Sequence, residues 1–153
     1  QIKEKIKREL KLLWLLQLSC LMNQNKSEIS PRIKVIQKIY GSLFNPDENI
    51  DYPKSQYKKF IKDVVEGTLE RRELIEEKIS EHLKNDINLK NTDKLLKIIL
   101  FAAVFELLFK HNNSKKVIIS EYLKTAEHFL EDIQIKYLNA ILDKISKILR
   151  KDQ

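Results

Sequence analysis

The sequence has 153 residues and a formal net charge of +7 at pH 7, with 29 Lys and Arg against 22 Asp and Glu. Its single cysteine excludes an internal disulfide framework, and its two glycines and three prolines favour long helices over a fold rich in tight turns. The positive charge favours a polyanionic partner, most plausibly nucleic acid, although lysine-rich chains also occur without a binding role. A chain of this length is most simply one domain, so we expect a single helical domain over residues 1–153.

The first predicted helix covers residues 3–23, where apolar side chains recur every three or four positions. The apolar stretch at residues 12–18 is too short for a membrane anchor, so we expect a cytoplasmic protein with no membrane partner. Cys20 lies near the end of this helix and is expected to be a buried, inert thiol rather than a nucleophile.

The first turns of this helix concentrate basic side chains, namely Lys3, Lys5, Lys7, Arg8 and Lys11. Cations at a helix N-terminus oppose the helix macrodipole, so this placement costs some stability. A basic arm that holds phosphates would explain the cost. The alternative is a solvated lysine surface with no ligand, because runs of charge are usually just solvated.

Two helices are predicted next. Pro31 has the position of a first helical residue behind an N-cap, and the short helix that it opens reaches about Leu43. Residues 45–49 have the composition of a turn. One long helix is then predicted to about residue 84, with any bend near Gly67. Its acidic residues alternate with Lys and Arg, which indicates a solvated, salt-bridged surface rather than a metal site.

Residues 95–109 form the most apolar stretch of the chain, interrupted after its first turn only by Glu106. A helix that is apolar on every side must be buried on every side, and this one is too short to span a bilayer. We therefore expect the central helix of a bundle, capped by Asn91 or Thr92. Two more helices follow, the first from Val117 to Phe129 and the second over residues 135–148. Asn113 or Ser114 is expected to cap the first of these two.

No pattern in the sequence indicates catalysis. The three histidines lie in separate segments without the spacing of a zinc site, and neither glycine belongs to a phosphate-binding loop. We therefore predict no catalytic residue, no metal and no cofactor, and a binding module rather than an enzyme.

Three polar residues fall among apolar neighbours on the last three predicted helices, namely Glu106, Glu121 and Asn139. Buried polar groups are regularly paired, so we expect all three to be structural polar ties inside the bundle. The alternative for either glutamate is a general acid with a raised pKa.

Three segments in the second half of the chain resemble one protein family, the bacterial transcription antitermination factors of the NusB family. Residues 99–107 (ILFAAVFEL) are similar to its run ILRIAxYEL, residues 114–121 (SKKVIISE) to PxKVAINE, and residues 137–144 (YLNAILDK) to FVNGVLDK. They align without a gap between Glu106 and Lys144. Residues of the first and middle predicted helices resemble the family more weakly.

The chain also departs from the family pattern. Phe101 stands where the family has Arg, Ser120 where it has Asn, and Ala140 where it has Gly. Lysines replace most of the family's N-terminal arginines, which keeps the charge but loses the bidentate fork of a guanidinium group.

The resemblance implies an all-α fold, a compact helical bundle of two antiparallel helical subdomains. It also implies pairing with NusE, which is a small-subunit ribosomal protein, and binding of single-stranded boxA-like RNA in ribosomal RNA transcripts. The pair would act in the RNA polymerase antitermination complex, and a homodimer of the free chain stays open.

Under this resemblance the RNA-binding residues are expected to be Lys3, Lys5, Lys7, Arg8, Lys116, Lys136 and Tyr137. Tyr137 would offer a ring on which an unstacked base rests, and plain core packing is its alternative. Two other functions remain open at this point. One is the NusB-like region of a ribosomal RNA methyltransferase, which would require a catalytic domain downstream, and the other is a purely protein-binding helical module.

Overall fold

The computed structural model describes residues 2–8 and 30–151. The chain divides into two compact units, residues 1–30 and 31–153, and each is described by itself. In the first unit, residues 2–8 are helical and exposed. The rest of the helix predicted over residues 3–23, with Cys20, lies outside the described residues. The single domain expected over the whole chain stays a prediction.

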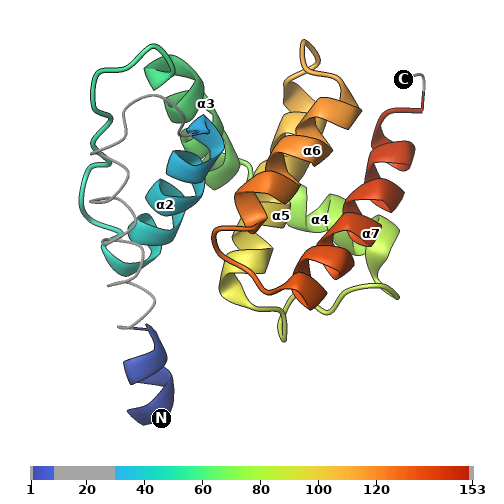
Figure 1. Cartoon of the computed structure of the whole chain (residues 1–153), viewed down its shortest axis with the longest axis horizontal. Helices are drawn as coiled ribbons and strands as arrows, with labels where there is room; N and C mark the ends of the chain where they lie inside the picture. Colours follow the sequence, from blue (N-terminus) through green and yellow to red (C-terminus); the bar gives the residue numbers. More distant parts are fainter. Residues whose placement is uncertain (1, 9–29, 152–153) are drawn as a thin grey trace. The chain divides into compact units, whose positions relative to one another are not determined.

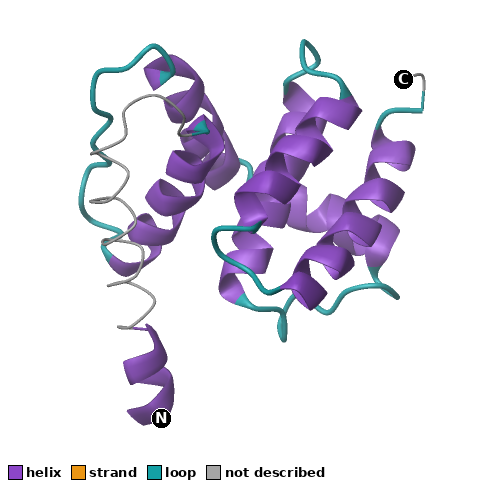
Figure 2. Ribbon diagram, viewed as in Figure 1, coloured by secondary structure: helices purple, strands orange, loops and turns teal. Residues whose placement is uncertain are grey.

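The second unit is built from six helices (Figure 1). In chain order they are α2 (Pro31–Phe44), α3 (Lys58–Glu70), α4 (Arg72–Leu83), α5 (Lys94–Phe109), α6 (Lys115–Ala126) and α7 (Asp132–Leu149). No strand occurs in the described part of the chain, as the colouring of Figure 2 shows. The all-α fold class expected from the sequence is thereby confirmed.

Helix α5 is the centre of the second unit. It contacts α2, α3, α4, α6 and α7, and 12 of its 16 residues are buried, including every residue from 98 to 107. The prediction of a central helix that is buried on all sides is confirmed. Neither α5 nor any other helix of residues 2–8 and 30–151 is long and apolar enough to cross a membrane.

The N-terminus of α5 is capped by Asp93, and the prediction of Asn91 or Thr92 is wrong. The Asp93 carboxylate accepts hydrogen bonds from the backbone N–H groups of Leu95 and Leu96. The Thr92 hydroxyl instead donates to the Asn88 carbonyl at 2.6 Å, so it belongs to the preceding turn. The predicted cap of α6 is confirmed, since the Ser114 hydroxyl accepts a hydrogen bond from the backbone N–H of Val117.

The long helix predicted to residue 84 is two helices. The chain leaves helical geometry at Arg71 (φ −104°, ψ 20°), between α3 and α4. The guanidinium carbon of Arg71 lies 4.3 Å from the centroid of the Phe109 ring, so a cation–π contact with the end of α5 accompanies the break. Gly67 is not the bend. A Cβ atom there would overlap the Phe105 ring, so this glycine allows α3 and α5 to approach closely.

Candidate nucleic-acid interface

The basic arm expected at the N-terminus is helical and exposed. Lys3, Lys5, Lys7 and Arg8 all lie on the helical residues 2–8, and every side chain there is open to solvent. Lys3 and Lys7 are four positions apart, so they share one side of the helix, while Lys5 and Arg8 share another. No ion pair joins the four cations to a described acidic residue. The arm therefore presents positive charge in more than one direction, with Glu4 as the one acidic side chain among residues 2–8.

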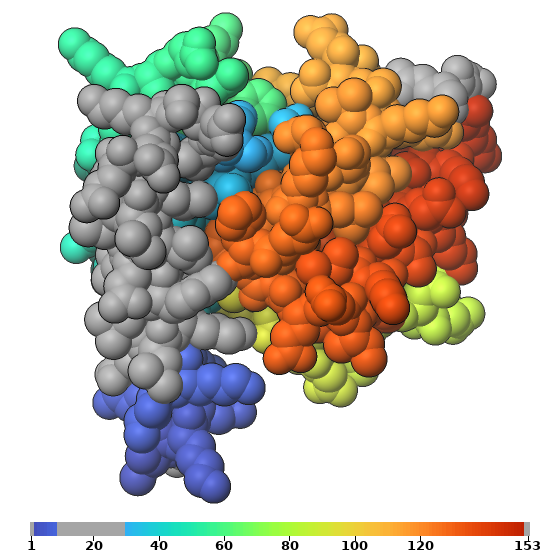
Figure 3. All heavy atoms as spheres, in the orientation of Figure 1, coloured from blue at the N-terminus to red at the C-terminus, as the bar shows by residue number. Residues whose placement is uncertain are grey.

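Lys116 and Lys136 lie near the N-terminal ends of two neighbouring helices, α6 and α7. Because these helices run antiparallel, the two lysines are far apart. Helices α6 and α7 pack against each other, and Figure 3 shows them side by side on one face of the second unit. The Arg150 guanidinium donates to the Asn113 carbonyl, which joins the end of α7 to the start of α6, so the two helices are antiparallel. From Lys136 to Arg150 the helix rises roughly 20 Å at 1.5 Å per residue. The two lysines are therefore not one local cluster.

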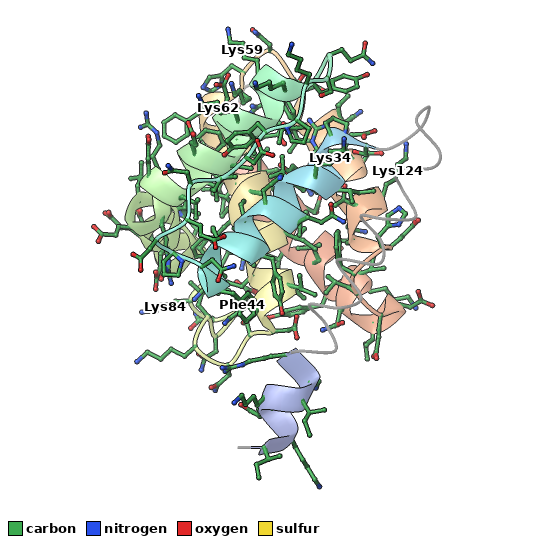
Figure 4. All side chains as sticks on the ribbon, turned by 90° about the vertical axis from the view of Figure 1, so that its left-hand side faces the viewer. Lys34, Phe44, Lys59, Lys62, Lys84 and Lys124 are labelled. Carbon is green, nitrogen blue, oxygen red and sulfur yellow. The ribbon has the colours of Figure 1, made fainter. Side chains whose placement is uncertain are left out.

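The exposed lysine at the end of α6 that leads into α7 was not predicted. Lys124, labelled in Figure 4, is exposed at the end of α6 that leads into α7, eight positions from Lys116. Exposed residues 116, 120 and 124 repeat every four positions, which places them on one side of α6. That spacing was the signal in the sequence that would have found Lys124. Its Nζ is 3.6 Å from Glu121 Oε1, so part of its charge is compensated.

Tyr137 is neither a core side chain nor a free ring. It is 41% exposed, and its hydroxyl donates to the Asp86 carbonyl at 2.7 Å. Partial burial and the charge of Asp86 raise the pKa of Tyr137, which favours the protonated phenol that donates this bond. Lys144, seven positions along α7, contacts the Asp86 carboxylate at 2.7 Å. The two side chains tie α7 to the segment after α4 and leave part of the Tyr137 ring accessible.

Glu106 is completely buried and paired with Arg32. The Arg32 Nε and Nη2 atoms donate to the two carboxylate oxygens at 2.9 and 2.7 Å, a bidentate pair across 74 positions of sequence. Arg32 was not predicted, although an arginine among buried apolar residues of α2 is itself a signal of a buried partner. Burial lowers the pKa of Arg32, but the hydrogen bond and charge of Glu106 outweigh it and raise the pKa above its ordinary value.

The other two expected polar ties differ. Glu121 is partly exposed, with its carboxylate 3.9 Å from Arg32 Nη1. Asn139 is exposed, so the expectation of a buried tie there is wrong. The buried face of α7 is formed by Leu138, Ile141 and their helical repeats, and residue 139 points away from that face. The apolar neighbour Ala140, which suggested burial, is exposed as well.

Tyr122 completes the buried polar group. Its ring is fully buried, and the Arg32 guanidinium carbon lies 5.4 Å from the ring centroid. Burial, and then the negative charge of Glu106, raise the pKa of Tyr122 well above its ordinary value. The group is thus a neutral phenol beside a charged pair, which suits a structural tie joining α2, α5 and α6. Within residues 2–8 and 30–151, no three side chains of the kinds that bind metal ions come together.

The NusB family model matches residues 7–147 of the chain. The transcription antitermination protein NusB of Rickettsia bellii (strain OSU 85-389) is 33% identical over 142 residues, covering 80% of this chain and 90% of that protein. The protein of the same name from Rhizobium meliloti (strain 1021) is 32% identical over 94 residues, covering 61% of this chain and 59% of that protein.

A solved structure of T. maritima NusB is similar to this chain with a TM-score of 0.65 and 26% sequence identity, covering 76% of this chain and 89% of that one. These relatives are named as transcription antitermination proteins, which are not enzymes, in agreement with the binding module expected from the sequence. Because the family model spans nearly the whole chain and a relative above 30% identity covers most of both proteins, this chain belongs to the NusB family.

Proposed function

We propose that the protein is an RNA-binding transcription antitermination factor. In this proposal it pairs with the ribosomal protein NusE and binds boxA-type single-stranded RNA in ribosomal RNA transcripts, within the RNA polymerase antitermination complex. The observation that carries the proposal is the exposed basic arm of Lys3, Lys5, Lys7 and Arg8 in a chain of the NusB family. A factor that acts on nascent bacterial transcripts works in the cytoplasm.

The physical basis of RNA binding would be phosphate neutralisation. Each phosphate contacted by a lysine or arginine releases condensed counterions, so affinity falls as salt rises, with a slope of about −0.7 per phosphate for single strands. The exposed Lys116, Lys124 and Lys136 would extend the contact along α6 and α7. The accessible part of the Tyr137 ring would stack on one base, which is worth about 1–3 kcal/mol where measured by alanine substitution.

The test is a salt titration of binding to a short boxA-like single-stranded RNA, with and without the ribosomal partner. The arm variant changes Lys3, Lys5, Lys7 and Arg8 together to Gln. Because four phosphate contacts account for up to about 2.8 units of slope, the variant should bind more weakly and show a visibly flatter dependence on salt. Association with the ribosomal partner should be unchanged.

The matched control removes the same amount of charge elsewhere. Lys54, Lys58, Lys59 and Lys62 are four exposed lysines without an ion pair to a described residue, and changing all four to Gln should leave the slope nearly intact. An equal loss in both variants would mean that only total charge matters, and would overturn the assignment of the arm. No RNA binding by the unaltered chain, with the ribosomal partner still bound, would instead favour the purely protein-binding module.

A further inference from the structure

A small apolar pocket opens between four helices of the second unit, at the end of the unit where α5 begins. Its volume is about 240 Å³, and its apolar lining comes from Ile39, Leu43, Leu69, Ile98 and Phe101. These side chains belong to α2, α3 and α5, and α4 begins at the rim. Phe101 is the position at which the chain departs from the Arg of the family run. The aromatic side chain contributes an apolar wall where the family pattern has a cation.

Three cations and no acid occur among the described residues at the rim of this pocket. Arg72, Lys94 and Lys97 all line it, and none of the other described lining residues is acidic. None of the three has an ion pair with a described residue. Lys94 Nζ lies 5.6 Å from the ring centroid of Phe44, at the end of α2 in Figure 4, and Lys97 Nζ lies 5.6 Å from that of Phe101. The two lysines therefore lie against aromatic rings, and all three cations keep their charge available to a ligand.

Thr68 provides an independent observation at the same place. Its side chain lines the pocket and is only 3% exposed, yet its hydroxyl forms no hydrogen bond in the described part of the chain. A buried hydroxyl without a partner costs free energy that a ligand would recover by accepting or donating one bond. The unpaired hydroxyl is therefore a group with which a ligand of the pocket would gain a hydrogen bond.

The lining of the pocket favours an apolar protein side chain over a metabolite or a nucleic-acid base as its ligand. Its volume suits one large apolar side chain. A metabolite site needs several placed polar groups to fix orientation, and Thr68 is the only uncharged polar residue among the described residues of the lining. A nucleic-acid base needs a flat aromatic platform, and most of this lining is aliphatic. Apolar anchors that enter a desolvated pocket dominate protein–protein contacts, and charges around the edge select the partner.

We propose that this pocket is a docking site for an acidic segment of a protein partner, which inserts one large apolar side chain. The flanking carboxylates of the segment face Arg72, Lys94 and Lys97, and a backbone group of the segment bonds the Thr68 hydroxyl. The site shares no residue with the basic arm or with the α6–α7 lysines, so the proposal depends on neither the RNA contacts nor the ribosomal partner proposed above.

The test is a nuclear magnetic resonance titration of the full chain with the capped pentapeptide acetyl-Glu-Asp-Leu-Glu-Asp-amide. The backbone amides of Thr68 and Phe101 should shift on binding. A peptide with Ala in place of Leu should bind at least tenfold more weakly, because the anchor is lost. A peptide with Gln and Asn in place of the acids should also bind more weakly, and its deficit should shrink at high salt.

Variants of the protein provide the second half of the test. Changing Arg72, Lys94 and Lys97 to Gln should reduce binding of the leucine peptide at least tenfold. The same change at Lys54, Lys59 and Lys62, which lie outside the lining, should leave binding within twofold; Lys59 and Lys62 are labelled on α3 in Figure 4. The isosteric Thr68→Val should weaken peptide binding severalfold without lowering the urea midpoint of unfolding, since the unbound hydroxyl stabilises nothing.

Three results would overturn the proposal. Equal binding of the leucine and alanine peptides would show that no anchor enters the pocket. Loss of stability in Thr68→Val would show that the hydroxyl already has a structural partner. Displacement of the peptide by a ten-nucleotide oligouridine that shifts the same amides and binds more tightly would assign the surface to nucleic acid.

Discussion

The two halves of α5 differ in whether their polar groups are paired within the protein. In its C-terminal half the Glu106 carboxylate is held by Arg32, and the carbonyls of Glu106 and Leu107 accept hydrogen bonds from Arg150. Arg150 also bonds the carbonyls of Lys110 and Asn113, so one guanidinium donates to carbonyls at the end of α5 and in the turn that follows it. In the N-terminal half, Lys94 and Lys97 have no ion pair with a described residue and border an open pocket.

The charged groups at the C-terminal end of α5 stabilise the fold, whereas those at its N-terminal end stay accessible to a ligand. Burial lowers the pKa of Arg150, opposed by the charge of Glu106, but a guanidinium stays charged at any pH a protein meets. Its hydrogen bonds are charge-assisted and among the stronger ones a protein makes. A lysine at the other end of the same helix contributes little to the free energy of folding and can bind a ligand. Mutations should therefore act on folding in the C-terminal half and on binding in the N-terminal half.

The largest effect is expected at the buried pair. Glu106→Leu leaves the Arg32 guanidinium buried with its bidentate partner removed, and breaking a buried pair on one side costs about 3–5 kcal/mol. Chemical denaturation should show this loss. The double change Arg32→Met and Glu106→Leu replaces both charges by apolar groups and should recover most of it. A double variant no more stable than the single one would mean that packing, rather than the lone charge, causes the loss.

The next effect is expected at the end of the chain. Arg150→Gln removes charge-assisted donors from four carbonyls around the end of α5, and we expect a loss of about 2–4 kcal/mol in the free energy of unfolding. Lys94→Gln and Lys97→Gln are the comparison at the other end, and each should change stability by less than about 0.5 kcal/mol. Similar costs at both ends would remove the distinction between the two halves.

A smaller effect distinguishes the two glycines. Gly67→Ala gains helix propensity but places a methyl group against the Phe105 ring, so we expect a net loss of about 1–2 kcal/mol from overpacking. Gly41→Ala is the matched control on α2, because no described residue lies within 4 Å of a Cβ atom at that position. There the gain in propensity should stabilise the protein by up to about 1 kcal/mol. Thermal melting of both variants decides whether close packing on α5 requires Gly67.

The smallest effect at neutral pH concerns Tyr122. Its pKa in the folded protein is raised well above the ordinary value by burial, so folding favours the neutral phenol. That contribution is fully present below the unfolded pKa of about 10 and is lost as pH rises above it toward the folded pKa. Stability measured from pH 9 to 11 should therefore fall, and Tyr122→Phe should make the fall shallower. The raised pKa values of Tyr52, about 12, and Tyr137 leave part of the dependence in place.

Local pattern predicted the elements of the second unit that depend on neighbours in sequence. The apolar stretch of residues 95–109, interrupted only by Lys97 and Glu106, required a buried helix, and α5 is that helix. Ser114 could be identified as a cap because its hydroxyl bonds a backbone group only three positions away. The same kind of local argument failed for Arg71 and Asn139, where packing against other helices decides whether a helix breaks and which side of it is buried.

The sequence by itself determined that the protein is helical, that α5 is central and that the N-terminus of the chain is basic. Periodicity and local charge can be read from residues that are close together in the sequence. Only the tertiary structure decided that Glu106 pairs with Arg32, 74 positions away, and that Arg150 closes the end of α5. It also decided that Lys94, Lys97 and Thr68 surround one pocket. Such pairings depend on which helix faces are brought together in space, and nothing in the spacing of residues along one chain specifies that.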